Sequence, residues 1–172
     1  MRLFTLLLAA AVAAPALAAD PAPEIRRDPA PAQAPGKLHA LRTIPEACAR
    51  MQGEFTGDAA QPYKFAVVRT SANCQARARL VDAAKAKPSA RSGWIFNDII
   101  RVPNAACATQ QAVVRVWRHP ADVAPPKLDG QGRSRIYLKE SLAKAKAGQL
   151  APIPVYAASM AVEGMPCGAG AG

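Results

Sequence analysis

Four cysteines are the sequence feature that most constrains how this chain folds. Cys48, Cys74, Cys107 and Cys167 all lie behind an N-terminal segment typical of exported proteins. In an oxidising compartment an even number of cysteines indicates disulfides, and four cysteines allow three pairings. We favour Cys48–Cys74 and Cys107–Cys167, because each bond then joins an element to one that follows it in the chain. The sequence therefore predicts a small domain held by two disulfides.

Redox catalysis and metal binding are the competing roles for cysteine. Both need short spacings such as C-x-x-C, whereas even the two nearest cysteines, Cys48 and Cys74, lie far apart in the chain. The chain has two histidines, His39 and His119, and neither lies beside a cysteine. We therefore expect no metal site and no cofactor.

The first 19 residues have the pattern of a secretory signal. Met1-Arg2 is followed by an apolar run from Leu3 to Ala14 and by the small residues Ala16-Leu17-Ala18. The run is about a dozen residues long, whereas a helix that spans a bilayer needs about 20. We predict a cleaved signal and a periplasmic or secreted protein without a transmembrane segment; an uncleaved signal anchor is the alternative. No cysteine follows the cleavage point to carry a lipid anchor.

Composition divides the remaining chain into three parts. Residues 20–42 are rich in proline and alanine and predict a disordered tether. Residues 43–167 contain the cysteines and the hydrophobic runs, and their number suits a single domain. Residues 168–172, Gly-Ala-Gly-Ala-Gly, predict a flexible tail.

The start of the predicted domain has a helix signal followed by alternating runs. Thr43 can cap a helix with Pro45 in its first turn, so we expect a short helix to Gln52, with an irregular turn as the alternative. Tyr63–Thr70 and Cys74–Val81 alternate like two strands of a hairpin. The second run competes with a helix over Gln75–Lys87, which is rich in alanine, arginine and lysine.

The second half of the domain adds more short strands. We expect strands at Trp94–Val102, ending before Pro103, and at Ala112–Arg118, Arg135–Lys139 and Val155–Val162, with a helical turn at Ser141–Ala147. Helical crossovers are mostly missing. The sequence predicts a mainly β fold (β-rich α+β), a small antiparallel sheet or sandwich of about six strands with one or two short helices.

Positive charge is the one feature of the composition that indicates a partner. The chain has 22 basic and 12 acidic residues, and the predicted domain keeps 17 basic against 9 acidic, a net charge of +8. If the strands form as expected, Lys64, Arg77, Arg79 and Arg115 can share a face that attracts anionic polymers. The alternative is that these cations only solvate the outside of the sheet and protect its edges.

Candidate catalytic groups are scattered. His119 lies near Asp122, and Ser92, Ser134 or Ser141 could approach it, but none sits in a G-x-S-x-G frame. Trp94 and Trp117 could stack on sugars or bases, although tryptophans among isoleucine, phenylalanine and valine are more often core. Gly130-Gln131-Gly132-Arg133 lacks the strand-to-helix setting of a phosphate loop.

The sequence alone leaves the function open between three classes. Our working hypothesis is a non-enzymatic exported domain that binds an anionic envelope component through a basic face formed by Lys64, Arg77, Arg79 and Arg115. The first alternative is a protein-partner module, for example an enzyme inhibitor that binds an acidic protein. The second is a hydrolase with a site around His119. We do not expect nucleic acid to be the physiological partner.

Overall fold

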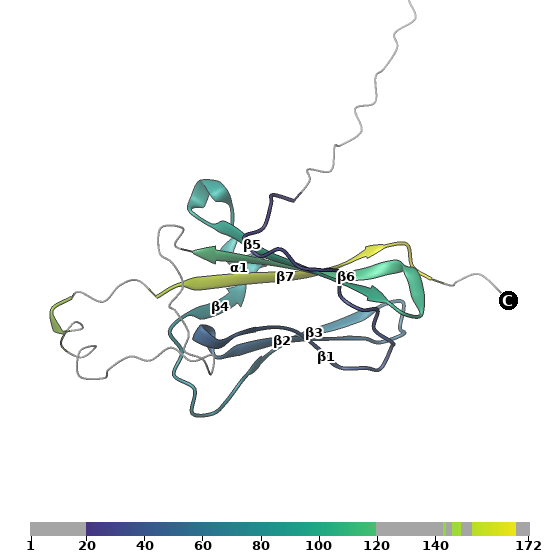
Figure 1. Cartoon of the computed structure of the whole chain (residues 1–172), viewed down its shortest axis with the longest axis horizontal. Helices are drawn as coiled ribbons and strands as arrows, with labels where there is room; N and C mark the ends of the chain where they lie inside the picture. The colour runs from purple at the N-terminus through teal and green to yellow at the C-terminus, as the bar shows by residue number, and fades with distance from the viewer. Residues whose placement is uncertain (1–19, 120–142, 144–145, 149–152, 168–172) are drawn as a thin grey trace, which may run out of the picture.

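Two β-sheets face each other in a computed structural model of the chain, which describes residues 20–119, 143, 146–148 and 153–167 (Figure 1). One sheet has the order β1-β2-β3, and the other has the order β4-β7-β6-β5. The mainly β fold class is confirmed. Residues 1–19, the predicted strand at 135–139, most of the predicted helix at 141–147 and the tail at 168–172 lie outside the described residues.

The three-stranded sheet is an antiparallel meander. It consists of β1 (His39–Ile44), β2 (Ala49–Phe55) and β3 (Tyr63–Arg69), with the 3-10 turn η1 (Pro45–Ala47) between the first two strands. The predicted helix over Thr43–Gln52 is therefore wrong, apart from this single turn. Cys48 adopts a left-handed φ of 51° where the chain turns into β2, and Met51 and Phe55 then alternate with less buried neighbours and enter the core.

Gly53 lies in the middle of β2 rather than at the end of a helix. The hydroxyl of Tyr63 occupies the place of a side chain there, because a Cβ built on Gly53 would lie 1.6 Å from that oxygen. His39 also contacts this hydroxyl, with 2.8 Å between its Nε2 atom and the Tyr63 oxygen. Glycine at this position thus lets the Tyr63 ring cross the strand and pack on Phe55.

The four-stranded sheet is mostly antiparallel. Its strands are β4 (Arg79–Asp82), β5 (Ile95–Asn104), β6 (Cys107–His119) and β7 (Val155–Gly164), and only the β4–β7 pair is parallel. The short helices α1 (Ala83–Ala86) and η2 (Ala90–Ser92) connect β4 to β5. β5 continues through Pro103 to Asn104, so the strand does not stop where the sequence predicts.

The predicted hairpin between Tyr63–Thr70 and Cys74–Val81 is wrong, because the two runs enter different sheets. The backbone amides of Arg77 and Ala78 donate hydrogen bonds to the carbonyl of Glu46, at 2.6 and 2.9 Å, and hold this segment beside η1. Both interpretations of the segment are partly correct: Arg79–Asp82 is a strand, and a short helix follows it. The side chain of Asp82 caps that helix by accepting from the Ala84 amide at 2.9 Å.

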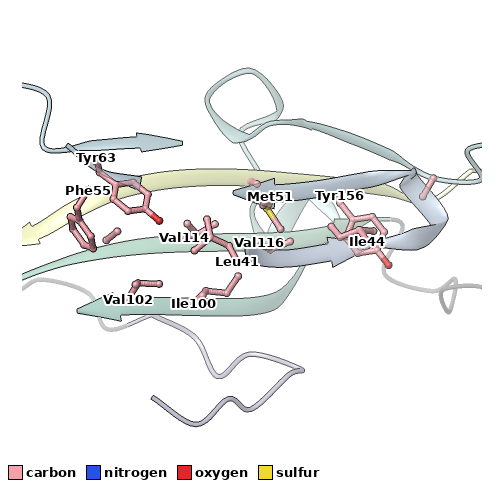
Figure 2. Packing of buried hydrophobic residues seen from close by; sticks show 13 residues of the cluster. Leu41, Ile44, Met51, Phe55, Tyr63, Ile100, Val102, Val114, Val116 and Tyr156 are labelled. Carbon is pink, nitrogen blue, oxygen red and sulfur yellow. The ribbon is translucent and has the colours of Figure 1, made fainter. Parts of the chain in front are cut away.

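The core lies between the two sheets (Figure 2). Its members occupy every second position of their strands, so alternation of apolar and polar residues in the sequence identifies them. The largest are Leu41, Ile44, Met51, Phe55, Tyr63, Ile100, Val102, Val114, Val116 and Tyr156. Trp94 and Trp117 are half-buried and do not belong to this cluster. Trp117 packs on Phe96 with ring centres 5.6 Å apart, and Trp94 packs on His119 at 5.1 Å.

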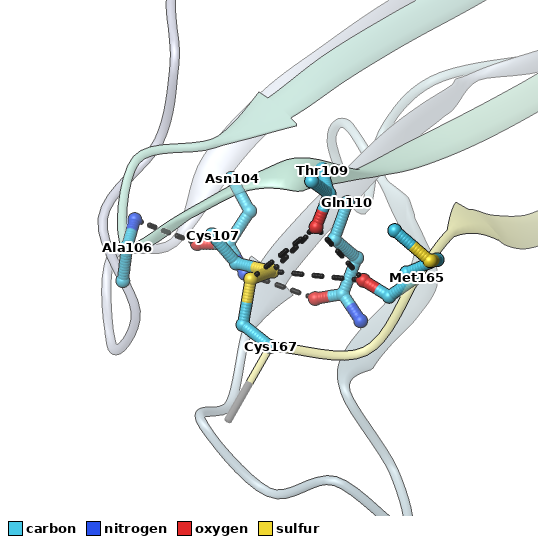
Figure 3. The surroundings of a disulfide bond; sticks show 7 residues. All are labelled: Asn104, Ala106, Cys107, Thr109, Gln110, Met165 and Cys167. Carbon is cyan, nitrogen blue, oxygen red and sulfur yellow. Dashed lines mark hydrogen bonds between the residues drawn. A yellow bond between two sulfur atoms is a disulfide. The ribbon is translucent and has the colours of Figure 1, made fainter. Parts of the chain in front are cut away.

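Both favoured disulfides form. Cys48–Cys74 joins the turn after η1 to the segment before β4, and Cys107–Cys167 joins the start of β6 to the chain after β7. Thr109 lies beside the second bond and donates its hydroxyl to the Met165 carbonyl at 3.1 Å (Figure 3). The bonds therefore close the two ends of the sandwich, and the described residues contain no free cysteine.

Residues 20–38, which we call the strap, follow the edge of β5. The sequence predicts a disordered tether over 20–42, but β1 begins at His39 and the strap forms backbone hydrogen bonds to β5 near both of its ends. The difference has a physical reason: charged strap residues find buried partners on β5 and β6, and these contacts between distant residues leave no local sequence pattern. In Figure 1 the strap is the dark purple segment beside β5.

Candidate functional site

The structure does not bring the four predicted anion-binding residues together. Lys64 is exposed on the outward face of β3, whereas Arg115 lies on the outward face of the other sheet, between the core residues Val114 and Val116. Arg79 is exposed at an outer strand of that second sheet, and Arg77 is half-buried in the segment before it. The predicted common face of Lys64, Arg77, Arg79 and Arg115 is therefore not present.

Arg115 is also already paired with carboxylates. Its guanidinium donates to both oxygens of Asp20 at 2.8 Å and to Glu163 at 2.7 Å. The hydrogen bonds with Arg115 lower the pKa of both carboxyls and raise the pKa of the Arg115 guanidinium. Arg115 thus fixes the first residue of the strap to the sheet and is not a free cation.

The catalytic candidates do not assemble in the described part of the chain. His119 packs against Trp94 and lies beside Gly93. The hydroxyl groups of Ser92 and Ser89 form a hydrogen bond with each other. Asp122, Ser134 and Ser141 lie outside the described residues. No group of three or more histidine, cysteine or carboxylate side chains is arranged for a metal ion in the described segments.

The strap forms backbone hydrogen bonds with β5 at two places. Between these two places the strap moves away from the strand. The amides of Glu24 and Ile25 donate to the carbonyls of Phe96 and Asn97, at 3.0 and 2.9 Å. Further along, the amide of Gln33 donates to the carbonyl of Pro103 at 2.9 Å. Pro29 and Pro31 lie between these anchors and cannot donate to a ladder, because proline has no amide hydrogen.

At this gap, backbone groups of β5 have no partner among the described residues. In an antiparallel pair, alternate residues direct both their N–H and their C=O away from the neighbouring strand. The register of β5 with β6 is unbroken from Asp98 to Pro103, so Ile99 and Arg101 face the same way as Pro103, toward the strap. None of the described residues forms a hydrogen bond with these outward groups of Ile99 or Arg101.

A groove of 820 Å³ opens at this gap between the strap, β1 and β5. Its volume lies within the roughly 300–1,000 Å³ typical of ligand sites. Most of its lining is apolar and comes from prolines of the strap and from Ile25, Ala40, Leu41, Ile99, Ile100 and Val102. Its charged and polar lining residues are Arg26, Arg27, Asp28, Arg101 and Gln111. The groove thus combines an unpaired strand edge with apolar walls and several charges.

A buried ion cluster fixes one end of the groove. Asp98 is fully buried and accepts three hydrogen bonds from Arg27 of the strap, at 2.7 to 2.9 Å, and one from Arg42 of β1 at 3.0 Å. Arg42 also lies over the ring of Tyr156, 5.9 Å from its centre. Burial lowers the pKa of the Arg42 guanidinium, an effect that the Asp98 charge opposes.

Three neighbouring hydrogen bonds extend this cluster. Arg118 donates to Glu24 of the strap at 2.8 Å, and the Asn97 amide group donates to the same carboxylate at 2.7 Å. The hydrogen bond from Arg118 is the main reason why the pKa of Glu24 is lowered. The Tyr156 hydroxyl donates to Glu46 at 2.6 Å, and burial raises the pKa of this tyrosine. The cluster therefore ties the strap and both sheets together.

Sequence reasoning missed this groove, although two signals for it exist. Pro103 lies inside a hydrophobic strand, which is typical of an edge strand whose amide side faces outward. Pro29 and Pro31 follow closely after the charged run Arg26-Arg27-Asp28, so the segment combines ladder-breaking residues with charges that can be paired. Neither signal indicates which strand the strap contacts.

Comparisons with protein-family models, with curated proteins and with solved structures found no match to this chain. None of the helices in the described segments is long and apolar enough to cross a membrane.

Proposed function

We propose that this chain is a non-enzymatic exported domain that binds an extended peptide segment of a partner protein in the groove between the strap and β5. One observation carries the proposal: the outward backbone groups of Ile99 and Arg101 face an open groove where the strap leaves the strand edge. An unpaired strand edge accepts another strand, and its backbone groups supply the hydrogen bonds.

The dimensions of the gap suit a short strand. The strap's anchors on β5 are at Asn97 and Pro103, and six residues of strand span about 20 Å. A peptide of about four or five extended residues fills that length. It would add to the edge of the four-stranded sheet and restore the ladder that Pro29 and Pro31 interrupt.

The lining of the groove favours a particular kind of peptide. Alternate side chains of an added strand would point toward the apolar side near Leu41 and Val102 and toward the outward face near Arg101. Arg26, on the strap, is exposed and has no ion-pair partner among the described residues. We therefore expect a peptide in which apolar residues alternate with acidic ones, consistent with the net charge of +8 on the domain.

This proposal retains the hypothesis of a protein-partner module and rejects the hypothesis of an anion-binding basic face. Binding of an anionic polymer through Lys64, Arg77, Arg79 and Arg115 needs these cations on one surface, and they lie on different parts of the molecule. The signal pattern of residues 1–19 and the two disulfides support export to the periplasm or beyond.

The proposal is tested with the chain from residue 20 onward and a blocked peptide of alternating valine and glutamate. Calorimetric titration should show binding, and the backbone amide resonances of Ile99 and Arg101 should shift most. The same peptide is also made in two N-methylated forms, one methylated at every valine and one at every glutamate; the form that loses the donors facing β5 should bind at least tenfold more weakly than the unmethylated peptide. Absence of binding at millimolar peptide would overturn the proposal, as would equal affinity of the unmethylated peptide and both methylated forms.

Variants at Ile99 separate backbone from side-chain effects. Ile99→Pro removes the outward amide hydrogen and should abolish binding, whereas Ile99→Ala keeps that donor and should retain most of the affinity. Thermal melts check that both variants fold. Equal loss in the two folded variants would show that the side chain, and not strand addition, carries the interaction.

A further inference from the structure

A second strand edge, β3, differs from the other three in being neither short, nor interrupted, nor covered by another described segment, and its charged residues lie only near its ends. The edge of β5 is partly covered by the strap, β4 has only 4 residues, and β1 is interrupted by an irregularity at Leu41. Proteins prevent edge strands from pairing with other chains by keeping them short, irregular or covered, or by placing charges along them. β3 has 7 residues, an unbroken register with β2 and no proline.

The side chains of β3 leave apolar surface at this edge. Val67 is 47% exposed although it faces the inner side of the sheet, and Phe65 beside it is only partly buried. Ala66 is exposed on the outward side, between Lys64 and Val68. The charges of the strand thus lie near its ends, and its centre is apolar.

We propose that two copies of this chain pair through β3 in antiparallel orientation, about a two-fold axis at Ala66. The two three-stranded sheets then join into one continuous sheet. A second copy is the partner that the strand fits best, because pairing the sequence Tyr63–Arg69 with its own reverse places no like charges opposite each other.

The cross-strand pairs follow from this register. Ala66 meets Ala66 at the axis, so the smallest side chain of the strand lies where the two copies approach most closely. Phe65 faces Val67, which buries the partly exposed apolar surface of both copies, and Lys64 faces Val68. At the ends, Tyr63 faces Arg69, and these two residues keep their contacts within their own copy: Tyr63 is buried over Gly53, and the Arg69 guanidinium donates to the carbonyls of Ser71 and Cys74. Aromatic and β-branched pairs of this kind stabilise antiparallel sheets.

Ala66 also offers a sharp test, because the same position lies opposite itself only in this dimer. Sedimentation equilibrium of the unmodified chain should show dimers that dissociate on dilution. Ala66→Lys places two positive charges opposite each other and should weaken dimerisation by about tenfold or more at low salt, with partial recovery at high salt. Thr43→Lys, at an exposed position on β1, is the matched control and should dimerise like the unmodified chain.

Mixing variants distinguishes this interface from a loss of folding. Ala66→Glu alone should weaken dimerisation to a similar degree, whereas an equimolar mixture of Ala66→Glu and Ala66→Lys should form a heterodimer. A chain that stays monomeric at millimolar concentration would overturn the proposal, as would an Ala66→Lys variant that dimerises as well as the control. Because β3 and β5 are edges of different sheets, peptide binding in the groove would be unaffected by either outcome.

Discussion

Asp98→Asn should destabilise this protein far more than the loss of any exposed carboxylate. The Asp98 side chain is fully buried between Arg27 and Arg42, and asparagine keeps its shape while removing its charge. The Arg42 side chain is only 11% exposed and would remain as a buried cation without its anion. Breaking a buried pair from one side costs about 3–5 kcal/mol.

The structure places the expected loss near the lower end of this range. The Arg27 side chain is 35% exposed, so water can replace part of its lost interaction. We expect the free energy of unfolding to fall by about 3 kcal/mol, which for a domain of this size lowers the Tm by about 10 °C. Reversible urea unfolding followed by circular dichroism measures the free energy, and calorimetry measures the Tm.

Glu163→Gln is the matched control, because it also removes one carboxylate that bridges two arginines. Glu163 is 35% exposed and its partners are Arg101 and Arg115, so its loss should cost at most about 1 kcal/mol. In addition, the double variant Asp98→Asn with Arg42→Met should be more stable than Asp98→Asn alone, since no charge is then left buried without a partner. Equal destabilisation by the two single variants, or no recovery in the double variant, would refute the reasoning.

Three further results should follow from the fold. Tyr156→Phe removes the hydroxyl that donates to Glu46 at 2.6 Å and should lower the free energy of unfolding by about 1.5–3 kcal/mol in urea titrations; an unchanged midpoint would contradict a buried hydrogen bond. Replacing both Cys107 and Cys167 by alanine should lower the free energy of unfolding by about 4 kcal/mol. This loss should be somewhat larger than the loss from replacing Cys48 and Cys74, because the sequence separations are 60 and 26. A larger loss for the Cys48–Cys74 pair in urea unfolding would count against the loop-entropy account. The pKa of Glu24 is lowered in the fold, so its contribution is present above the ordinary value of 4.5 and is lost as the pH falls below it. Hydrogen exchange, corrected for the intrinsic rate, should show that the strap opens first in acid. Glu24→Gln should remove most of this pH dependence. If the strap of the unmodified chain and that of Glu24→Gln open equally in acid, the Arg118–Glu24 pair is not the acid-sensitive contact.

The strands that alternate along the sequence could be predicted because each sheet has one face in the core. Tyr63–Thr70 and Val155–Val162 match the observed strands β3 and β7 to within two residues, and Ala112–Arg118 lies inside the longer strand β6. The disulfide pairing was also predictable, since neighbouring elements in the chain hold the bonded cysteines. A local sequence pattern predicts a strand correctly where every second residue of that strand is buried.

The remaining features depend on contacts between distant residues. A capping signal at Thr43 predicts a helix, but the alternation of Met51 and Phe55 across the core outweighs it. The Arg42–Asp98 contact joins residues 56 positions apart, and nothing near either residue in sequence shows that it will be paired. For the same reason, counting cations could not distinguish Arg115, which holds two carboxylates, from Lys64, which faces solvent.

The position of the strap at the start of the chain has a consequence for the order of folding. The amides of Glu24, Ile25 and Gln33 donate to carbonyls of β5, and Arg118 at the end of β6 is 94 positions away from its partner Glu24. Loop-closure entropy makes such distant pairing late, so the first described segment of the chain should be among the last to dock. While it waits, the edge of β5 is open along its whole length. A partner peptide that reaches the folding chain in this interval would compete directly with the strap for the anchors at Phe96 and Pro103.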